Sequence, residues 1–295
     1  MKSLPTDRDT YAVSVKASLI AKIGLGVQIA LCAFLASAAP AIATELEEIR
    51  DRGHIIIGVK DNRAPLSFLT EEDTLAGFEI DIAERLAEEL LGDRTALRLI
   101  PVSNTNRINS VITGETDIAI AAITITSARR RIINFSDPYY LDGAAFITRK
   151  PNIRTLRDLA AARIAILDGS SNVPRVRYIL PGAELIGVSS YAQGQTLIAT
   201  NQVDAFAGDA SILTSWQPPD QTEYRILPSI ISAEPLAIAI PKGIQHNTLQ
   251  TEINRLLRQW YAEGWLQSRA AHWGLPSETA QFLELSPAAP TDAKP

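Results

Sequence analysis

The apolar residues of this chain fall into short runs that alternate with amphipathic stretches, and this pattern predicts a mixed α/β fold. β-branched runs typical of buried strands occupy 54–59, 97–102 and 118–123. Apolar residues at helical spacing occupy 45–52, 77–91 and 104–113. Strands that alternate with helices favour a sheet with helices packed on its faces.

The same alternation starts again after Lys150. The predicted strands are 163–167, 184–188, 203–207 and 234–240, and the predicted helices are 154–161, a helix from Val173, 191–200, 210–215, 247–262 and 264–273. The two halves show similar architecture but no sequence repeat. From Ser277 the apolar pattern fades, and we expect 277–295 to be a disordered tail.

The first 43 residues have the pattern of a secretory signal peptide. An uncharged apolar run, 23–39, follows two lysines and leads to an Ala-x-Ala sequence that ends at Ala43. As a membrane anchor the run is short, and small rather than basic residues follow it. The single cysteine, Cys32, follows Leu31, which is a poor match to a lipoprotein site. We therefore expect cleavage after Ala43 and a periplasmic mature protein.

Composition narrows the classes of function. The 295 residues are 46% hydrophobic and 21% charged, as in ordinary globular proteins, and the length suits two domains or one large one. The net charge is −5 and no long basic patch occurs, which argues against nucleic acid as a partner. Three scattered histidines give neither metal-ligand spacing nor a catalytic motif, so we expect no metal, no cofactor and no catalytic residue.

Hydroxyl and arginine side chains follow the predicted strand 118–123. Thr124 opens a segment with three hydroxyls, Arg129 begins a predicted helical turn, and the Asp-Pro of 135–140 predicts a turn before a second apolar run, 144–148. An arginine can hold a carboxylate through two parallel hydrogen bonds, and ligands bind at the carboxyl ends of strands in open α/β sheets. We expect Arg129 and Thr124 to bind an anion, and the next two arginines to be solvated.

Two other strand ends carry polar clusters, namely Lys60-Asp61 and Gly169-Ser170-Ser171, and Asp209 follows a third. Together with Arg129 these residues offer charged and polar groups that could bind both charges of a zwitterion. Arg129 and a helix start near Ser171 suit an α-carboxylate, and Asp209 suits an α-ammonium. An Asp after a strand is more often a helix cap, and Asp209 can fill both roles.

Three segments make a resemblance specific: GVKDNRAPLSF, GFEIDIAERLAEEL and AITITSARRRIINFSDPYY. They resemble the solute-binding proteins of polar amino-acid ABC importers (family 3) and the ligand cores of ionotropic glutamate receptors, over about 45–275. The resemblance implies a two-lobed periplasmic-binding-protein (type 2) clamshell with two crossover strands. Lobe 1 would be 45–145 with 241–276, and lobe 2 would be 146–240. The implied function is a monomeric subunit that binds a free polar amino acid and delivers it to a membrane permease.

The resemblance also assigns site residues. It implies that Arg129, Thr124 and the Ser171 backbone bind the α-carboxylate. It implies that Asp209, Thr124 and the carbonyl of Ala122 bind the α-amino group. Ala122 stands where the family often has glycine.

The side-chain pocket is less determined by the sequence. Lys60 matches a basic position of glutamate and aspartate binders, and Asp61 matches an acidic position of glutamine- and lysine-type binders. The two could also pair with each other and leave a neutral polar pocket. Asn62 and Arg63 stand where the family often has a stacking aromatic residue, which argues against a basic ligand. We expect glutamate, aspartate or a neutral polar amino acid such as glutamine.

Two other functions compete with transport. A few relatives of this family are dehydratases of cyclic amino-acid precursors, and catalysis would need an acid or base aimed at the ligand. A periplasmic sensor acting in trans would bind the same ligand but feed a signalling partner. We expect a binding protein, not an enzyme, because the sequence shows no catalytic motif.

Overall fold

The computed structural model describes residues 45–216, 223–228 and 231–275. The predicted signal peptide with Cys32 and the predicted tail 277–295 lie outside these ranges. Within them, no helix combines the length and apolarity needed to cross a membrane.

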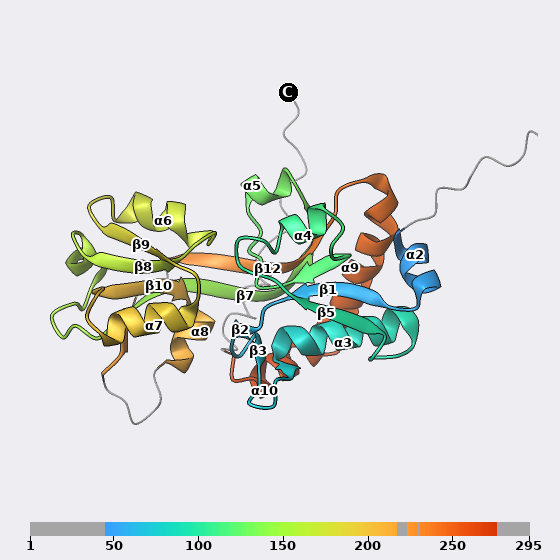
Figure 1. Cartoon of the computed structure of the whole chain (residues 1–295), viewed down its shortest axis with the longest axis horizontal. Coiled ribbons are helices and arrows are strands. Elements are labelled where there is room, and N and C mark those ends of the chain that lie inside the picture. The colour runs from blue at the N-terminus through green and yellow to red at the C-terminus, as the bar shows by residue number, and fades with distance from the viewer. Residues whose placement is uncertain (1–44, 217–222, 229–230, 276–295) are drawn as a thin grey trace, which may run out of the picture. The chain divides into compact units, whose positions relative to one another are not determined.

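A sheet of nine strands forms the centre of the structure, in the order β5-β1-β6-β12-β7-β10-β8-β9, with β11 paired to β7. In that order the strands are β5 (Leu97–Pro101), β1 (Ile55–Val59), β6 (Ile118–Ile120), β12 (Ser232–Ile240), β7 (Asn134–Thr148), β10 (Ala205–Asp209), β8 (Arg163–Leu167), β9 (Glu184–Val188) and β11 (Arg225–Ile226). β1 is parallel to β5 and β6, and β8 is parallel to β9 and β10. The long antiparallel pair β7 and β12 joins these two parallel groups, as Figure 1 shows. The predicted α/β fold with two crossover strands is thus confirmed.

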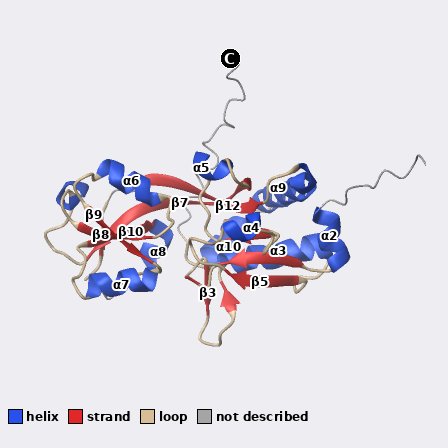
Figure 2. Ribbon diagram, turned by 45° about the horizontal axis from the view of Figure 1, so that its top comes forward, coloured by secondary structure: helices blue, strands red, loops and turns tan. Residues whose placement is uncertain are grey.

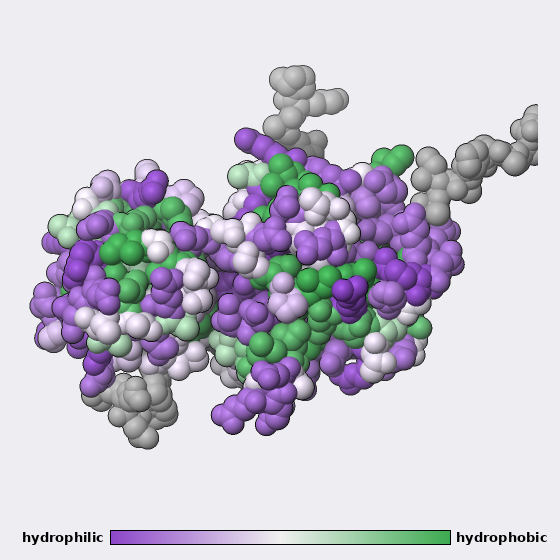
Figure 3. Space-filling model, in the orientation of Figure 1, coloured by the Kyte–Doolittle hydropathy of each residue, from purple (hydrophilic) through white to green (hydrophobic). Residues whose placement is uncertain are grey.

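Helices cover both faces of each group of strands, and Figure 2 shows the strands between them. They are α2 (Glu45–Arg52), α3 (Phe78–Leu91), α4 (Asn109–Ile112), α5 (Ser127–Arg130), α6 (Asn172–Ile179), α7 (Tyr191–Ala199), α8 (Ala210–Ser215), α9 (Asn247–Ala262) and α10 (Trp265–His272), with the 3₁₀ turns η1 (Leu156–Leu159) and η2 (Ile244–His246). The apolar stripe of α3 and that of α9 are fully buried, with Phe78 and Trp260 among the largest side chains inside. Hydrophilic residues cover much of the face drawn in Figure 3. These amphipathic helices therefore close the core as their periodicity predicts.

A small second sheet follows β1 and consists of β2 (Asn62–Arg63), β3 (Ser67–Leu69) and β4 (Leu75–Ala76). Gly77, between β4 and α3, has φ +128°, and a Cβ atom there would collide with the carbonyl of Leu66. Only glycine fits this close approach, which keeps the small sheet tight against the start of α3. The small sheet fixes the position of Arg63.

Three predicted elements differ in the structure. The predicted Asp-Pro turn is wrong, because 135–140 lies inside β7. Pro138 is tolerated there because the pairing of β7 with β12 shifts register around Ala237, and an irregularity needs no amide donor from proline. The predicted helix 104–113 shortens to α4, and 154–161 becomes the 3₁₀ turn η1.

Asp142 ties the crossover strand β7 to the start of α8. Its side chain is 2% exposed and accepts hydrogen bonds from the backbone amide of Gly143 at 2.7 Å and from that of Ser211 at 3.1 Å. The hydroxyl of Ser211 also donates to it. Burial, and after it the charge of Asp209, raises the pKa of Asp142 to about 7.

This raised pKa predicts a pH-dependent stability. A carboxyl whose pKa is higher in the folded state stabilises it fully below its ordinary pKa of about 4, and the contribution is lost as the pH rises through about 7. We expect the free energy of unfolding of the native protein, relative to Asp142→Asn, to fall over this window by up to about 1.4 kcal/mol per pH unit. Denaturant unfolding at several pH values measures the difference, with the exposed Asp51→Asn as control. Parallel pH curves for the native protein and Asp142→Asn would contradict the expectation.

Candidate functional site

Three strand ends meet at one junction between the two groups of strands. Thr124 follows β6, Ser171 and Gly169 follow β8, and Asp209 ends β10. The hydroxyl of Ser171 donates to the hydroxyl of Thr124 at 3.1 Å, and Nη2 of Arg129 donates to the carbonyl of Gly169 at 3.2 Å. Polar residues far apart in sequence are therefore brought together where the sequence analysis expected a ligand.

Arg129 is held by backbone carbonyls. Thr126 caps α5 by accepting a hydrogen bond from the amide of Arg129, and Nη1 of Arg129 donates to the carbonyl of Thr124 at 2.9 Å. Burial lowers the pKa of Arg129, and the nearby carboxylate of Glu234 acts against that shift. Arg130 and Arg131 are exposed, in accord with the sequence analysis.

Asp209 is 7% exposed and forms an ion pair with Arg63. Its other oxygen, Oδ1, accepts a hydrogen bond from Asn172 at 3.4 Å, and its backbone amide donates to the hydroxyl of Tyr191 at 3.0 Å. Asp209 stands at the N-cap position of α8, but its side chain makes no capping hydrogen bond. The capping role is not seen, because the carboxylate turns toward Arg63.

Arg63 is a site residue that the sequence analysis did not identify. Its side chain is buried, donates to the hydroxyl of Tyr191 at 3.3 Å, and lies with Cζ 5.2 Å from the centre of the Tyr191 ring. Its Nε and Nη1 atoms are buried without a hydrogen-bond partner. Burial lowers the pKa of Arg63, but Asp209, Tyr191 and Glu79 together outweigh burial and raise this pKa above the usual range. In the sequence, Arg63 shows only as a departure from the aromatic residue that the family often has.

Lys60 lies beside Arg63 and is also buried. Its ammonium group donates to the carbonyl of Val102 at 2.7 Å. Burial, then the charges of Arg63 and Arg107, lower the pKa of Lys60 to about 8. Both Lys60 and Asp61 are described residues, and they form no salt bridge with each other. The suggested Lys60–Asp61 pair is thus absent from the structure.

Ala122 has the left-handed φ of +50°, which costs about 1–2 kcal/mol for a residue with a Cβ atom. This explains why glycine suits the position. The amide of Ala122 donates to Glu79 at 2.7 Å, and its carbonyl accepts from Nη1 of Arg107 at 2.8 Å. A carbonyl oxygen has two lone pairs, so one remains for a second donor.

Glu79 and Arg107 form the floor of the junction. Both side chains are buried, and each keeps one atom without a partner, Oε2 of Glu79 and Nε of Arg107. Burial raises the pKa of Glu79, although the hydroxyl of Tyr139 donates to it and acts in the opposite direction. The sequence carries no signal for a site role of these two residues. Glu79 lies within an amphipathic helix, and Arg107 lies within a predicted helix.

Little free space remains beside Arg63. A cavity of about 10 Å³ lies among Lys60, Arg63, Asn104 and Tyr191, which is room for about one water molecule. Ligand pockets typically have a few hundred Å³. Binding of an amino acid here would therefore require the two sides to separate.

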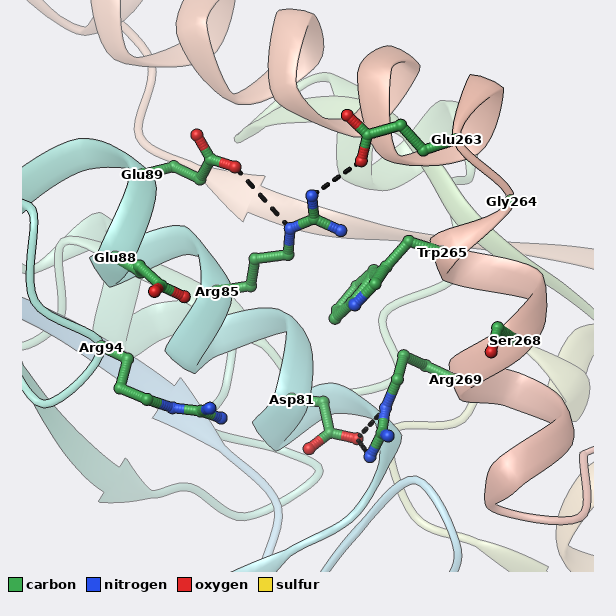
Figure 4. A pocket seen from close by; sticks show the side chains of 10 residues that line it. All are labelled: Asp81, Arg85, Glu88, Glu89, Arg94, Glu263, Gly264, Trp265, Ser268 and Arg269. Carbon is green, nitrogen blue, oxygen red and sulfur yellow. Dashed lines mark hydrogen bonds and ion pairs between the residues drawn. The ribbon is translucent and has the colours of Figure 1, made fainter.

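A larger depression of about 840 Å³ lies between α3 and α10, away from this junction (Figure 4). Arg85 lies between Glu89 and Glu263, at 3.7 and 2.8 Å, and Asp81 pairs with Arg269. These ion pairs tie α3 to α10 and to the end of α9, so we assign them a structural role. Among the described residues, no group of histidine, cysteine and acidic side chains could hold a metal ion.

Comparisons with known proteins show the family of this chain. The family model of bacterial extracellular solute-binding proteins, family 3, matches residues 55–276. The glutamine-binding protein of Geobacillus stearothermophilus is 32% identical over 200 residues, which cover 67% of this chain and 76% of that protein. The ABC transporter glutamine-binding protein of Bacillus subtilis is 28% identical over 222 residues, which cover 74% and 80%.

Solved structures agree as well. An ancestral amino acid-binding protein, a precursor of cyclohexadienyl dehydratase, matches with a TM-score of 0.71 and 26% identity, over 77% of this chain and 98% of that one. The cysteine-binding protein of Campylobacter jejuni matches in fold with a TM-score of 0.72 and 22% identity, over 78% and 92%. With its two parallel groups of strands joined by β7 and β12, this chain belongs to the bacterial extracellular solute-binding proteins of family 3.

Proposed function

We propose that this protein is the extracytoplasmic amino-acid-binding subunit of an ABC importer, and that its ligand is glutamate, aspartate or a glutamine-like polar amino acid. One observation carries the proposal. A half-buried arginine, Arg129, and a buried carboxylate, Asp209, reach the same junction, with the hydroxyls of Thr124 and Ser171 beside them. The names of the two glutamine-binding relatives support the choice of ligand class.

In this proposal the ligand's α-carboxylate binds Arg129, Thr124 and the backbone at Ser171. The turn before Ser171 depends on Gly169, which has φ +68° and lies against the carbonyl of Asn104. The ligand's ammonium binds Asp209, the hydroxyl of Thr124 and the free lone pair of the Ala122 carbonyl. Each charged group of the ligand thus meets a group of opposite charge, as a buried ion requires.

Binding then involves movement of two lobes, which we assign to 45–145 with 241–276 and to 146–240. β7 and β12 connect the lobes and are the proposed hinge. Because the ligand touches both lobes, it favours the conformation in which they approach each other. We propose that this conformation of the monomeric protein, secreted after loss of residues 1–43, docks on a membrane permease and delivers the ligand chemically unchanged.

A thermal-shift screen of the protein from Thr44 onward against the common amino acids tests the ligand class. A ligand that binds only the folded state raises the melting temperature by mass action. We expect a shift with acidic or amide amino acids. A screen without any shift would contradict amino-acid binding, and chemical conversion of a bound amino acid would favour an enzyme instead.

Arg129→Ala should weaken amino-acid binding by about 30-fold or more, because truncating one partner of a desolvated charge pair costs about 2–5 kcal/mol. Isothermal titration calorimetry measures the change. Arg130→Ala, which removes an exposed neighbour on the same helix, is the matched control and should bind as the native protein does. Equal affinities for Arg129→Ala and the control would remove Arg129 from the site.

Lys60→Met should weaken glutamate far more than glutamine, because only glutamate offers a carboxylate to the buried ammonium group. The pKa of Lys60 is about 8, and a lysine is charged below its pKa. The advantage of glutamate should therefore be present at neutral pH and fall as the pH rises through about 8. Equal losses for glutamate and glutamine would remove Lys60 from side-chain recognition.

A further inference from the structure

Arg63 forms an ion pair with Asp209, and Asp209 is the carboxylate that the proposed function assigns to the ligand's ammonium. Arg63 lies on β2 and Asp209 on β10, 146 positions away, and the ion pair between them crosses the junction. The two side chains are only 5% and 7% exposed. An ammonium group can therefore reach Asp209 only by displacing the guanidinium or by sharing the carboxylate with it.

Charge and the available acceptor atoms decide between displacement and sharing. Oδ1 of Asp209 already accepts a hydrogen bond from Asn172 at 3.4 Å. Two cations on one buried carboxylate would also repel each other, and this repulsion is strong where water is excluded. Ligand binding therefore separates Arg63 from Asp209.

The displaced guanidinium needs another anion. Its neighbours Lys60 and Arg107 are both cationic. Glu79 is the remaining nearby carboxylate among the groups that influence Arg63. Its Oε1 is bound by Tyr139 and by the amide of Ala122, its Oε2 has no partner among the described residues, and it makes no salt bridge with Arg63 in the structure. A buried cation left without a partner is strongly unfavourable.

The charge of the ligand side chain decides whether this cost arises. Glutamate or aspartate brings a second carboxylate, which can meet the unpartnered Nε and Nη1 of Arg63. Every charge at the junction then has a partner: the α-carboxylate at Arg129, the ammonium at Asp209 and the side chain at Arg63. Glutamine has a neutral side-chain amide. Its ammonium would displace Arg63 from Asp209, but its side chain offers Arg63 no negative charge.

We infer that Arg63 is a specificity-determining residue that favours an amino acid with a side-chain carboxylate over the corresponding amide. This inference rests on the proposed function and narrows its ligand class. The inferred preference for glutamate differs from the ligand in the names of the glutamine-binding relatives. An experiment that compares glutamate with glutamine can therefore distinguish the two possibilities.

Calorimetric titration of the native protein and of Arg63→Gln with glutamate and with glutamine tests the inference. The native protein should bind glutamate more tightly than glutamine. In Arg63→Gln the ratio of the two affinities should fall at least tenfold, and glutamine should bind as tightly as before or more tightly, because its competitor for Asp209 is gone. Arg131→Gln, at an exposed arginine, should keep the native ratio.

Each outcome has a definite meaning. An equal change for both ligands in Arg63→Gln overturns the inference. It would indicate that Glu79 balances the charge of the displaced guanidinium, or that Lys60 rather than Arg63 meets the side-chain carboxylate of the ligand. A native protein that binds glutamine as tightly as glutamate overturns it even if Arg63→Gln does not fold. A native protein that binds no amino acid contradicts the proposed function itself.

Discussion

The cost of burying charge constrains this molecule most strongly at the junction of its strand ends. Four cationic side chains and two carboxylates lie there with little access to water, and each buried charge needs a partner to be tolerated. The carboxyl ends of the strands supply backbone carbonyls for three of the cations, and Asp209 serves the fourth. The groups concerned are Lys60, Arg63, Arg107, Arg129, Asp209 and Glu79.

The crossover strands connect this charged junction to the rest of the fold. Asp142 on β7 and Glu234 on β12 are paired in register, and both are buried. Asp142 accepts hydrogen bonds from Ser211 at the start of α8, while Glu234 accepts one from Ser171 at the start of α6, at 3.3 Å. In the proposed mechanism, a change in the bend of β7 and β12 would therefore move the starts of α6 and α8. Movement of the lobes and occupation of the site would then be coupled through these acids.

Local patterns were sufficient for most elements and for part of the site. Amphipathic periodicity marked α3 and α9, because each helix buries one continuous apolar stripe whatever lies opposite it. Arg129 and Asp209 could be identified because they lie at or shortly after the carboxyl ends of strands, and strand ends meet at one edge of a sheet. The turn predicted at Pro138 was wrong. A proline within a strand depends on an irregularity in the pairing with the partner strand, which is distant in sequence.

The sequence by itself thus determined the alternation of strands and helices, the family and the strand-end residues, because each of these can be recognised from a short stretch of sequence. The roles of Arg63, Glu79 and Arg107 were decided only by the tertiary structure. The ion pair of Arg63 spans 146 positions, and the bonds of Glu79 and Arg107 to the backbone at Ala122 span 43 and 15. A short stretch of sequence cannot predict such distant partners. A buried charge is tolerated only where the folded chain brings a counterpart close to it.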